Sequence, residues 1–199
     1  MLSGRVERLR RHVMELMSSP AFAKLYYHNI IHTNDVYESS KRYAEEEQIE
    51  KEYVEPLLAA ALLHDIGYAK QYDANEPIGA EMAGEMLPKF GFDSEEVKLA
   101  QKLILATEFP QHPKDELEYI ICDADLDTLG TDRFLLRSLD LMDELEANKG
   151  KRYTLAEWYR SQLSLLESHK YFTNSARRLR EEGQNANIEK VRKLLKSEG

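Results

Sequence analysis

The chain has 199 residues, 42% of them hydrophobic, so it is long enough to bury a core, and we expect one domain. Its formal charge of -9 argues against a general nucleic-acid binder, because affinity for nucleic-acid phosphates comes from clustered lysines and arginines. The absence of a run of 18 apolar residues argues against a membrane helix, and the single cysteine, Cys122, excludes an intrachain disulfide. These features predict a cytoplasmic protein.

The elements predicted along the chain are all helices, because no stretch alternates polar and apolar residues with a period of two. In the first half we expect helices over 6–17, from His32 to the acidic run 45–47, over about 52–69, and from Pro77 to Leu87. The third of these contains Pro56-Leu57-Leu58-Ala59-Ala60-Ala61-Leu62-Leu63, which is apolar on every side. Such a helix belongs at the centre of a bundle, with the other helices packed around it.

In the second half, caps and stop signals delimit the helices. We expect helices over 95–107 behind a cap at Asp93 or Ser94, over about 115–129, over 134–145, over 158–168 behind a Thr154-Glu157 capping box, and over 175–182 and 187–196. The sequence therefore predicts a single all-α domain over 1–199. Residues 150–199 could form a peripheral helical lobe, and the last 25 residues could instead be an arm onto a second copy of the chain in a homodimer.

Three segments concentrate ionisable groups in apolar surroundings. His28 and His32 are four residues apart, which on a helix places both imidazoles on one face. His64-Asp65 closes the apolar central helix, and Ile121-Cys122-Asp123-Ala124-Asp125-Leu126 embeds two carboxylates in another apolar stretch. Buried ionisable groups require partners or a metal. A mixed set of imidazole nitrogens and carboxylate oxygens suits Mn²⁺, Fe²⁺, Co²⁺, Ni²⁺ or Mg²⁺.

In these segments the sequence resembles the HD-domain superfamily of metal-dependent phosphohydrolases, whose pattern is H…HD…D on a helical bundle. Tyr27-His28-Asn29-Ile30-Ile31-His32, followed by Thr33-Asn34-Asp35-Val36, is similar to the opening motif of the cyclic-nucleotide phosphodiesterase branch. Segments 62–68, 123–130 and 171–173 are similar to a branch of small bacterial hydrolases. The resemblance covers about residues 22–147, and it implies an HD-type helical bundle around the central helix.

The resemblance also implies roles for particular residues. The metal ligands would be His32, His64, Asp65 and Asp125, with Asp123 as the alternative to Asp125. His28 would be the general acid that protonates the leaving oxygen, and Asp65 would also take part in catalysis. Residues expected around the metal or the substrate are Asn29, Asp123, Glu76, Glu81 and Thr107.

One divalent ion per chain is expected, because Asn75-Glu76 and Thr107-Glu108 stand where related branches place further histidines. Glu76, Glu81 or His112 could assist a second, weaker ion. A calcium loop starting at Asp123 is excluded, because Thr128 stands where the loop requires glycine.

Two functions remain open from the sequence. The first is a hydrolase, either a phosphomonoesterase or a phosphodiesterase, acting on a nucleotide or another small phosphorylated compound. The second is a regulatory module that binds metal and nucleotide without turnover. His28 favours the enzyme, because sensing needs no general acid. Tyr68 replaces a histidine of the phosphodiesterase motif, so this motif does not establish specificity for cyclic nucleotides.

Overall fold

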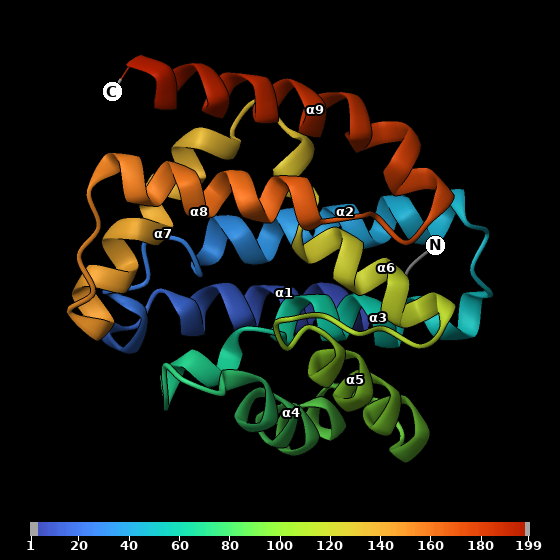
Figure 1. Cartoon of the computed structure of the whole chain (residues 1–199). Helices are drawn as coiled ribbons and strands as arrows, with labels where there is room; N and C mark the ends of the chain where they lie inside the picture. Colours follow the sequence, from blue (N-terminus) through green and yellow to red (C-terminus); the bar gives the residue numbers. More distant parts are fainter. Residues whose placement is uncertain (1–3, 198–199) are drawn as a thin grey trace. The chain divides into compact units, whose positions relative to one another are not determined.

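The protein is described by a computed structural model over residues 4–197, and over that range its regular structure is entirely helical, as the sequence predicts (Figure 1). The α-helices are α1 (Gly4–Met17), α2 (Ile30–Glu46), α3 (Lys51–Leu63), α4 (Asn75–Met86), α5 (Ser94–Ala106), α6 (Glu116–Asp125), α7 (Phe134–Lys149), α8 (Leu155–Ser168) and α9 (Asn174–Ser197). Short 3₁₀ helices lie between them: η1 (Pro20–Phe22), η2 (Ile66–Ala69), η3 (Leu87–Phe90) and η4 (Asp127–Gly130).

The chain divides into two compact units. The first comprises the chain up to Ala23 together with His28–Asp125, and the second comprises Lys24–Tyr27 and the chain from Leu126 onward. The second unit thus starts earlier than the lobe expected from residue 150. The organisation as a single domain stays a prediction.

Helix α3 is the centre of the first unit, as its composition predicts. Every residue from Pro56 to Leu63 is buried, and α1, α2, α4, α5 and α6 all pack against this helix. The helix ends at Leu63 rather than continuing to Ala69, and the chain enters η2 directly after His64-Asp65. A Cβ on Gly67 would lie 1.9 Å from the carbonyl oxygen of Asn75, so only glycine lets α4 start this close to the turn. The His64-Asp65 pair is therefore held between the end of α3 and the start of α4.

Helices α4 and α5 lie side by side in Figure 1, and their ends agree with the predicted stops within two residues. Asp93 caps α5 through a capping box with Glu96. Helix α6 is shorter than predicted, because it ends at Asp125 and is followed by η4 instead of continuing to about residue 129. Asp125 is consequently the last residue of its helix.

The second unit has a core of Leu129, Phe134, Leu166 and Val191. Thr154 and Glu157 form the predicted capping box of α8. The prediction of two separate C-terminal helices was wrong, because residues 174–197 form one continuous helix.

Tertiary contacts explain why α9 continues through residues that favour a break. A Cβ on Gly183 would lie 2.0 Å from the carbonyl oxygen of Gly130, so this glycine permits close packing of α9 on η4. The buried Asn187 donates hydrogen bonds from its side-chain amide to the carbonyls of Leu129, at 2.9 Å, and Thr131, at 2.7 Å. Gly183 therefore serves the packing of this unit, and Asn187 serves its hydrogen bonding.

Across residues 4–197, none of the helices has both the length and the apolar character that crossing a membrane requires.

Candidate metal centre

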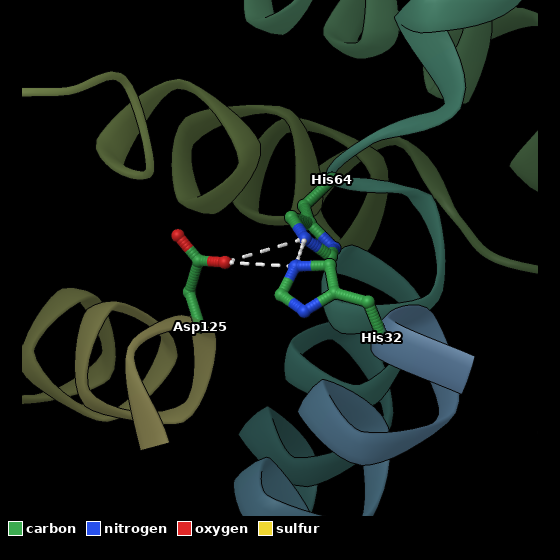
Figure 2. A group of neighbouring side chains, drawn as sticks. All are labelled: His32, His64 and Asp125. Atoms are coloured by element: carbon green, nitrogen blue, oxygen red, sulfur yellow. Dashed lines mark hydrogen bonds and ion pairs between the residues drawn. The ribbon is translucent and has the colours of Figure 1, made fainter. Parts of the chain in front are cut away.

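Three side chains from different helices converge at one point of the first unit (Figure 2). His32 comes from α2, His64 follows α3 directly, and Asp125 ends α6. One ligand atom from each lies within 4.8 Å of those of the other two. The Nε2 atoms of His32 and His64 are 3.2 Å apart, and Asp125 Oδ1 lies 3.1 Å from the first and 3.5 Å from the second.

The N-terminal cap of α2 places His32. The side-chain oxygen of Asn29 accepts hydrogen bonds from the backbone N–H groups of Ile31, at 2.9 Å, and His32, at 3.4 Å. His28 therefore precedes the helix instead of sharing a helical face with His32, and that part of the sequence interpretation was wrong. The two rings are nevertheless neighbours, with centroids 5.8 Å apart in an edge-to-face arrangement. Asn29 thus acts as a helix cap.

The orientation of His64 is fixed by the last turn of α3. Its Nδ1 lies 2.9 Å from the carbonyl oxygen of Ala61. Because a carbonyl only accepts, Nδ1 must carry a hydrogen, and Nε2 is then the nitrogen that faces His32 and the carboxylates. A hydrogen bond of this kind is the usual second contact of a metal-binding histidine.

Asp65 is not one of the three residues whose ligand atoms cluster, but it approaches both imidazoles. Its Oδ2 lies 3.1 Å from Nε2 of His64 and 3.4 Å from Nε2 of His32, but this buried oxygen has no contact with hydrogen-bond geometry. Its Oδ1 receives a long contact of 3.5 Å from the side-chain amide of the buried Asn75. A buried carboxylate oxygen without a hydrogen bond is costly, and a cation is the partner that removes this cost.

Asp125, and not Asp123, belongs to the convergent group. Asp125 directs Oδ1 to the imidazoles, while its Oδ2 accepts a hydrogen bond of 2.9 Å from the side-chain amide of Gln111. Asp123 is also fully buried on α6, but it is not one of the three residues whose ligand atoms cluster. The assignment of Asp125 as the metal ligand stays a prediction.

The charges of the group depend strongly on one another. Burial opposes protonation of His64, but the carboxylates of Asp65 and Asp125 outweigh it and raise the pKa of the imidazole well above its usual value. Burial likewise opposes ionisation of the two carboxyls, but the adjacent imidazoles hold the pKa of both below the usual range. The site therefore favours ionised carboxylates, which are acceptor-only ligands.

The donor atoms have the spacing that a divalent metal requires. Ligand bonds of about 2.1 Å separate neighbouring ligands by about 3.0 Å in an octahedron and about 3.4 Å in a tetrahedron. The five measured separations between imidazole and carboxylate atoms, or between the imidazoles, lie between 3.1 and 3.5 Å. Two facing Nε2 atoms can share only one proton, whereas a cation can bind both. The residues fit a divalent ion.

The other predicted residues differ in their burial and in their contacts with these ligand atoms. Glu76 is half-buried in the first turn of α4, and burial together with the charges of Asp65 and Asp125 raises the pKa of its carboxyl. Thr107 is buried at the end of α5, where its hydroxyl donates to the carbonyl of Ile104. Glu81 and His112 are exposed, and no contact among the described residues joins either to the metal group.

Sequence reasoning missed Gln111 and the role of Asn75. The side-chain amide of Gln111 donates to Asp125, and that of Asn75 makes the long contact to Asp65. Both residues lie in or next to a loop. The sequence gives one signal for Gln111, which is its position between Pro110 and Pro113 in the short connection that leads to α6. Asn75 was noted only as a loop residue in a position where related proteins have histidine.

The fold and this site define a class of protein: an all-α bundle with a group of histidine and aspartate side chains that could hold a metal ion at the end of its buried helix. The sequence profile of the HD domain matches residues 29–128, just over half of the chain. The chain belongs to the HD domain family.

Two solved structures are similar over nearly the whole chain. One is a predicted HD superfamily hydrolase from an uncultured Thermotogales bacterium, with a TM-score of 0.61 and 23% identity over 98% of this chain and 91% of the other. The second is Bacillus subtilis YpgQ in complex with ADP, with a TM-score of 0.68 and 20% identity over 96% of this chain and 97% of the other. At these identities the similarity shows a shared fold. None of the curated proteins compared matches the chain.

Proposed function

We propose that this protein is a metal-dependent phosphohydrolase acting on a nucleotide or another small phosphate ester. One observation carries the proposal: the hydrogen bond from His64 Nδ1 to Ala61 directs Nε2 to the point where Nε2 of His32 and Oδ1 of Asp125 also lie. This arrangement turns three potential ligand atoms towards one point, where a metal ion could bind all of them. The stability of the end of α3 would not require these three atoms to converge.

His32, His64, Asp65 and Asp125 would hold the ion, and the side-chain amides of Asn75 and Gln111 would orient the two carboxylates. A bound divalent ion supplies positive charge to the phosphoryl oxygens and increases the acidity of water. One ion per chain follows from the single convergent group found among residues 4–197. The raised pKa of Glu76 keeps open a weaker second position close to Asp65.

Asp65 is the better candidate to accept a proton from the attacking water. Oδ2 of Asp125 already accepts a hydrogen bond of 2.9 Å from Gln111, whereas Oδ1 of Asp65 receives a contact of 3.5 Å from Asn75. The weaker contact leaves a lone pair of Asp65 more accessible to a new proton. Asp125 then acts as ligand alone.

His28 is the candidate general acid. Its ring neighbours that of His32 and is only partly buried, so it lies next to the metal group with access to a substrate. An imidazole donates a proton near neutral pH and typically contributes ~10²- to 10⁴-fold to the rate. The leaving oxygen of an ester accepts this proton as its bond to phosphorus breaks.

A small phosphorylated substrate fits better than a nucleic acid, because the chain has a net charge of -9 and the site needs only local positive charge. The complex of YpgQ with ADP supports a nucleotide as the first compound to test. The same binding chemistry would serve a regulatory module that holds a nucleotide without hydrolysing it, which makes turnover the decisive measurement.

The test is a turnover screen of nucleotides, phosphomonoesters and phosphodiesters with Mn²⁺, Fe²⁺, Co²⁺, Ni²⁺ and Mg²⁺. We expect hydrolysis that depends on metal, and His32→Ala should lose metal and activity together. His28→Ala should keep the metal but slow phenyl phosphate by roughly 10² or more, with a smaller loss on 4-nitrophenyl phosphate, whose leaving oxygen needs little protonation. Tight nucleotide binding without turnover by the metal-loaded protein would instead identify a regulatory module.

A further inference from the structure

Tyr68 contacts the candidate general acid directly. Its ring centroid lies 4.6 Å from that of His28, and the two planes are inclined by 31°. Its hydroxyl oxygen is 3.5 Å from Nε2 of His28. That distance is at the outer limit of a hydrogen bond, but contacts of this kind often shorten when a substrate is bound.

The backbone of Tyr68 is hydrogen-bonded to Asp65. Tyr68 lies in η2, and its N–H donates to the carbonyl of Asp65 at 3.1 Å. The other neighbour of its ring is Tyr72, whose centroid is 5.2 Å away. Because Tyr68 is partly buried and its ring contacts two others, its side chain has less freedom to change rotamer.

His28 lies outside α2, which begins at Ile30 with Asn29 as its cap. Its imidazole contacts two other rings, that of Tyr68 with centroids 4.6 Å apart and that of His32 with centroids 5.8 Å apart. The contact with Tyr68 therefore takes part in setting the direction in which His28 presents a proton.

We propose that Tyr68 is a positioning residue that acts through His28: its ring and hydroxyl hold the imidazole in the orientation from which it protonates the leaving oxygen. This inference rests on the proposed phosphohydrolase function and adds a determinant of leaving-group specificity to it. Because the backbone N–H of Tyr68 donates to the carbonyl of Asp65, Tyr68 and the His64-Asp65 pair belong to one short turn. Misplacement of a catalytic group by about 1 Å can cost roughly 10²-fold in rate.

The experiment measures kcat and KM of the metal-loaded protein on phenyl phosphate and 4-nitrophenyl phosphate. Tyr68→Ala should lower kcat on phenyl phosphate by roughly 10² and change KM little, while its loss on 4-nitrophenyl phosphate stays below about 10-fold. Tyr68→Phe keeps the ring contact but removes the hydroxyl, so its loss on phenyl phosphate should be smaller than that of Tyr68→Ala. Tyr53→Phe, at an exposed tyrosine on α3, is the control and should be unaffected.

A double-mutant cycle separates positioning from general damage. In a His28→Ala background, Tyr68→Ala should cause no further loss, because the group through which it acts is gone. Additive losses would overturn the proposal, as would equal losses on both esters or loss of metal from Tyr68→Ala. Turnover by the wild type with no effect of Tyr68→Ala would reject the positioning role alone. Failure of the wild type to hydrolyse any ester would reject the proposed function as well.

A measurement without turnover tests the contact itself. The ring of Tyr68 should shift the NMR signal of the His28 imidazole Cε1–H, and Tyr68→Ala should return this signal towards that of an exposed histidine. An unchanged signal would show that the two rings are not in contact in solution and would overturn the proposal.

Discussion

Replacing Gln111 with alanine should weaken metal binding without unfolding the protein. Its amide donates to Oδ2 of Asp125 at 2.9 Å, and hydrogen bonds to charged groups contribute about 1.5–3 kcal/mol. The side chain of Asp125 is 17% exposed, so water can replace part of this bond. We therefore expect a loss just below this range, about 1.4 kcal/mol or roughly tenfold in Kd.

Folding stability should fall by less than the full value of this hydrogen bond, because the variant also removes the buried Oε1 of Gln111, which has no hydrogen-bond partner in the structure. Titration of Mn²⁺ against a competing chelator measures Kd, with Gln71→Ala, at an exposed glutamine, as the control. An unchanged Kd would show that Gln111 does not orient Asp125 in the loaded protein. A loss beyond about 10³-fold would contradict the reasoning in the opposite way, because it would make Gln111 a ligand.

Two further predictions concern the choice of ligand and the packing of α9. Asp125→Ala should abolish metal binding, whereas Asp123→Ala should weaken it by at most ~10- to 100-fold. If metal titrations gave the reverse order, Asp123 and not Asp125 would be the ligand. Gly183→Ala should destabilise the protein by about 1–3 kcal/mol in urea unfolding, because a Cβ would lie 2.0 Å from the Gly130 carbonyl oxygen. Gly4→Ala, whose Cβ meets only a flexible arginine end at 3.5 Å, is its control, and equal effects would refute the packing argument.

The helical fold and the central helix were predictable because they follow from composition. Residues 56–63 have no polar face, and each helix around them carries an apolar stripe that must be buried. The capping boxes at Asp93 and Thr154 were equally readable, because they depend on residues three positions apart. Local sequence thus determines much of this architecture.

Features that depend on distant contacts were not predictable. The continuity of α9 through Gly183 depends on η4, which lies about 50 residues earlier in the chain. The position of His28 outside α2 depends on Asn29, which can cap a helix or continue one equally well in the sequence. Gln111 could not be assigned to Asp125, because nothing in a loop sequence states where its side chain will point.

The metal centre can be tested most directly by elemental analysis and calorimetric titration of the purified protein. We predict about one divalent transition-metal ion per chain, bound by the wild type and lost on His32→Ala while the helical circular-dichroism spectrum is retained. Neither co-purified metal nor saturable binding of Mn²⁺, Fe²⁺, Co²⁺ or Ni²⁺ by the folded wild type would contradict the assignment of His32, His64 and Asp125 as a metal site.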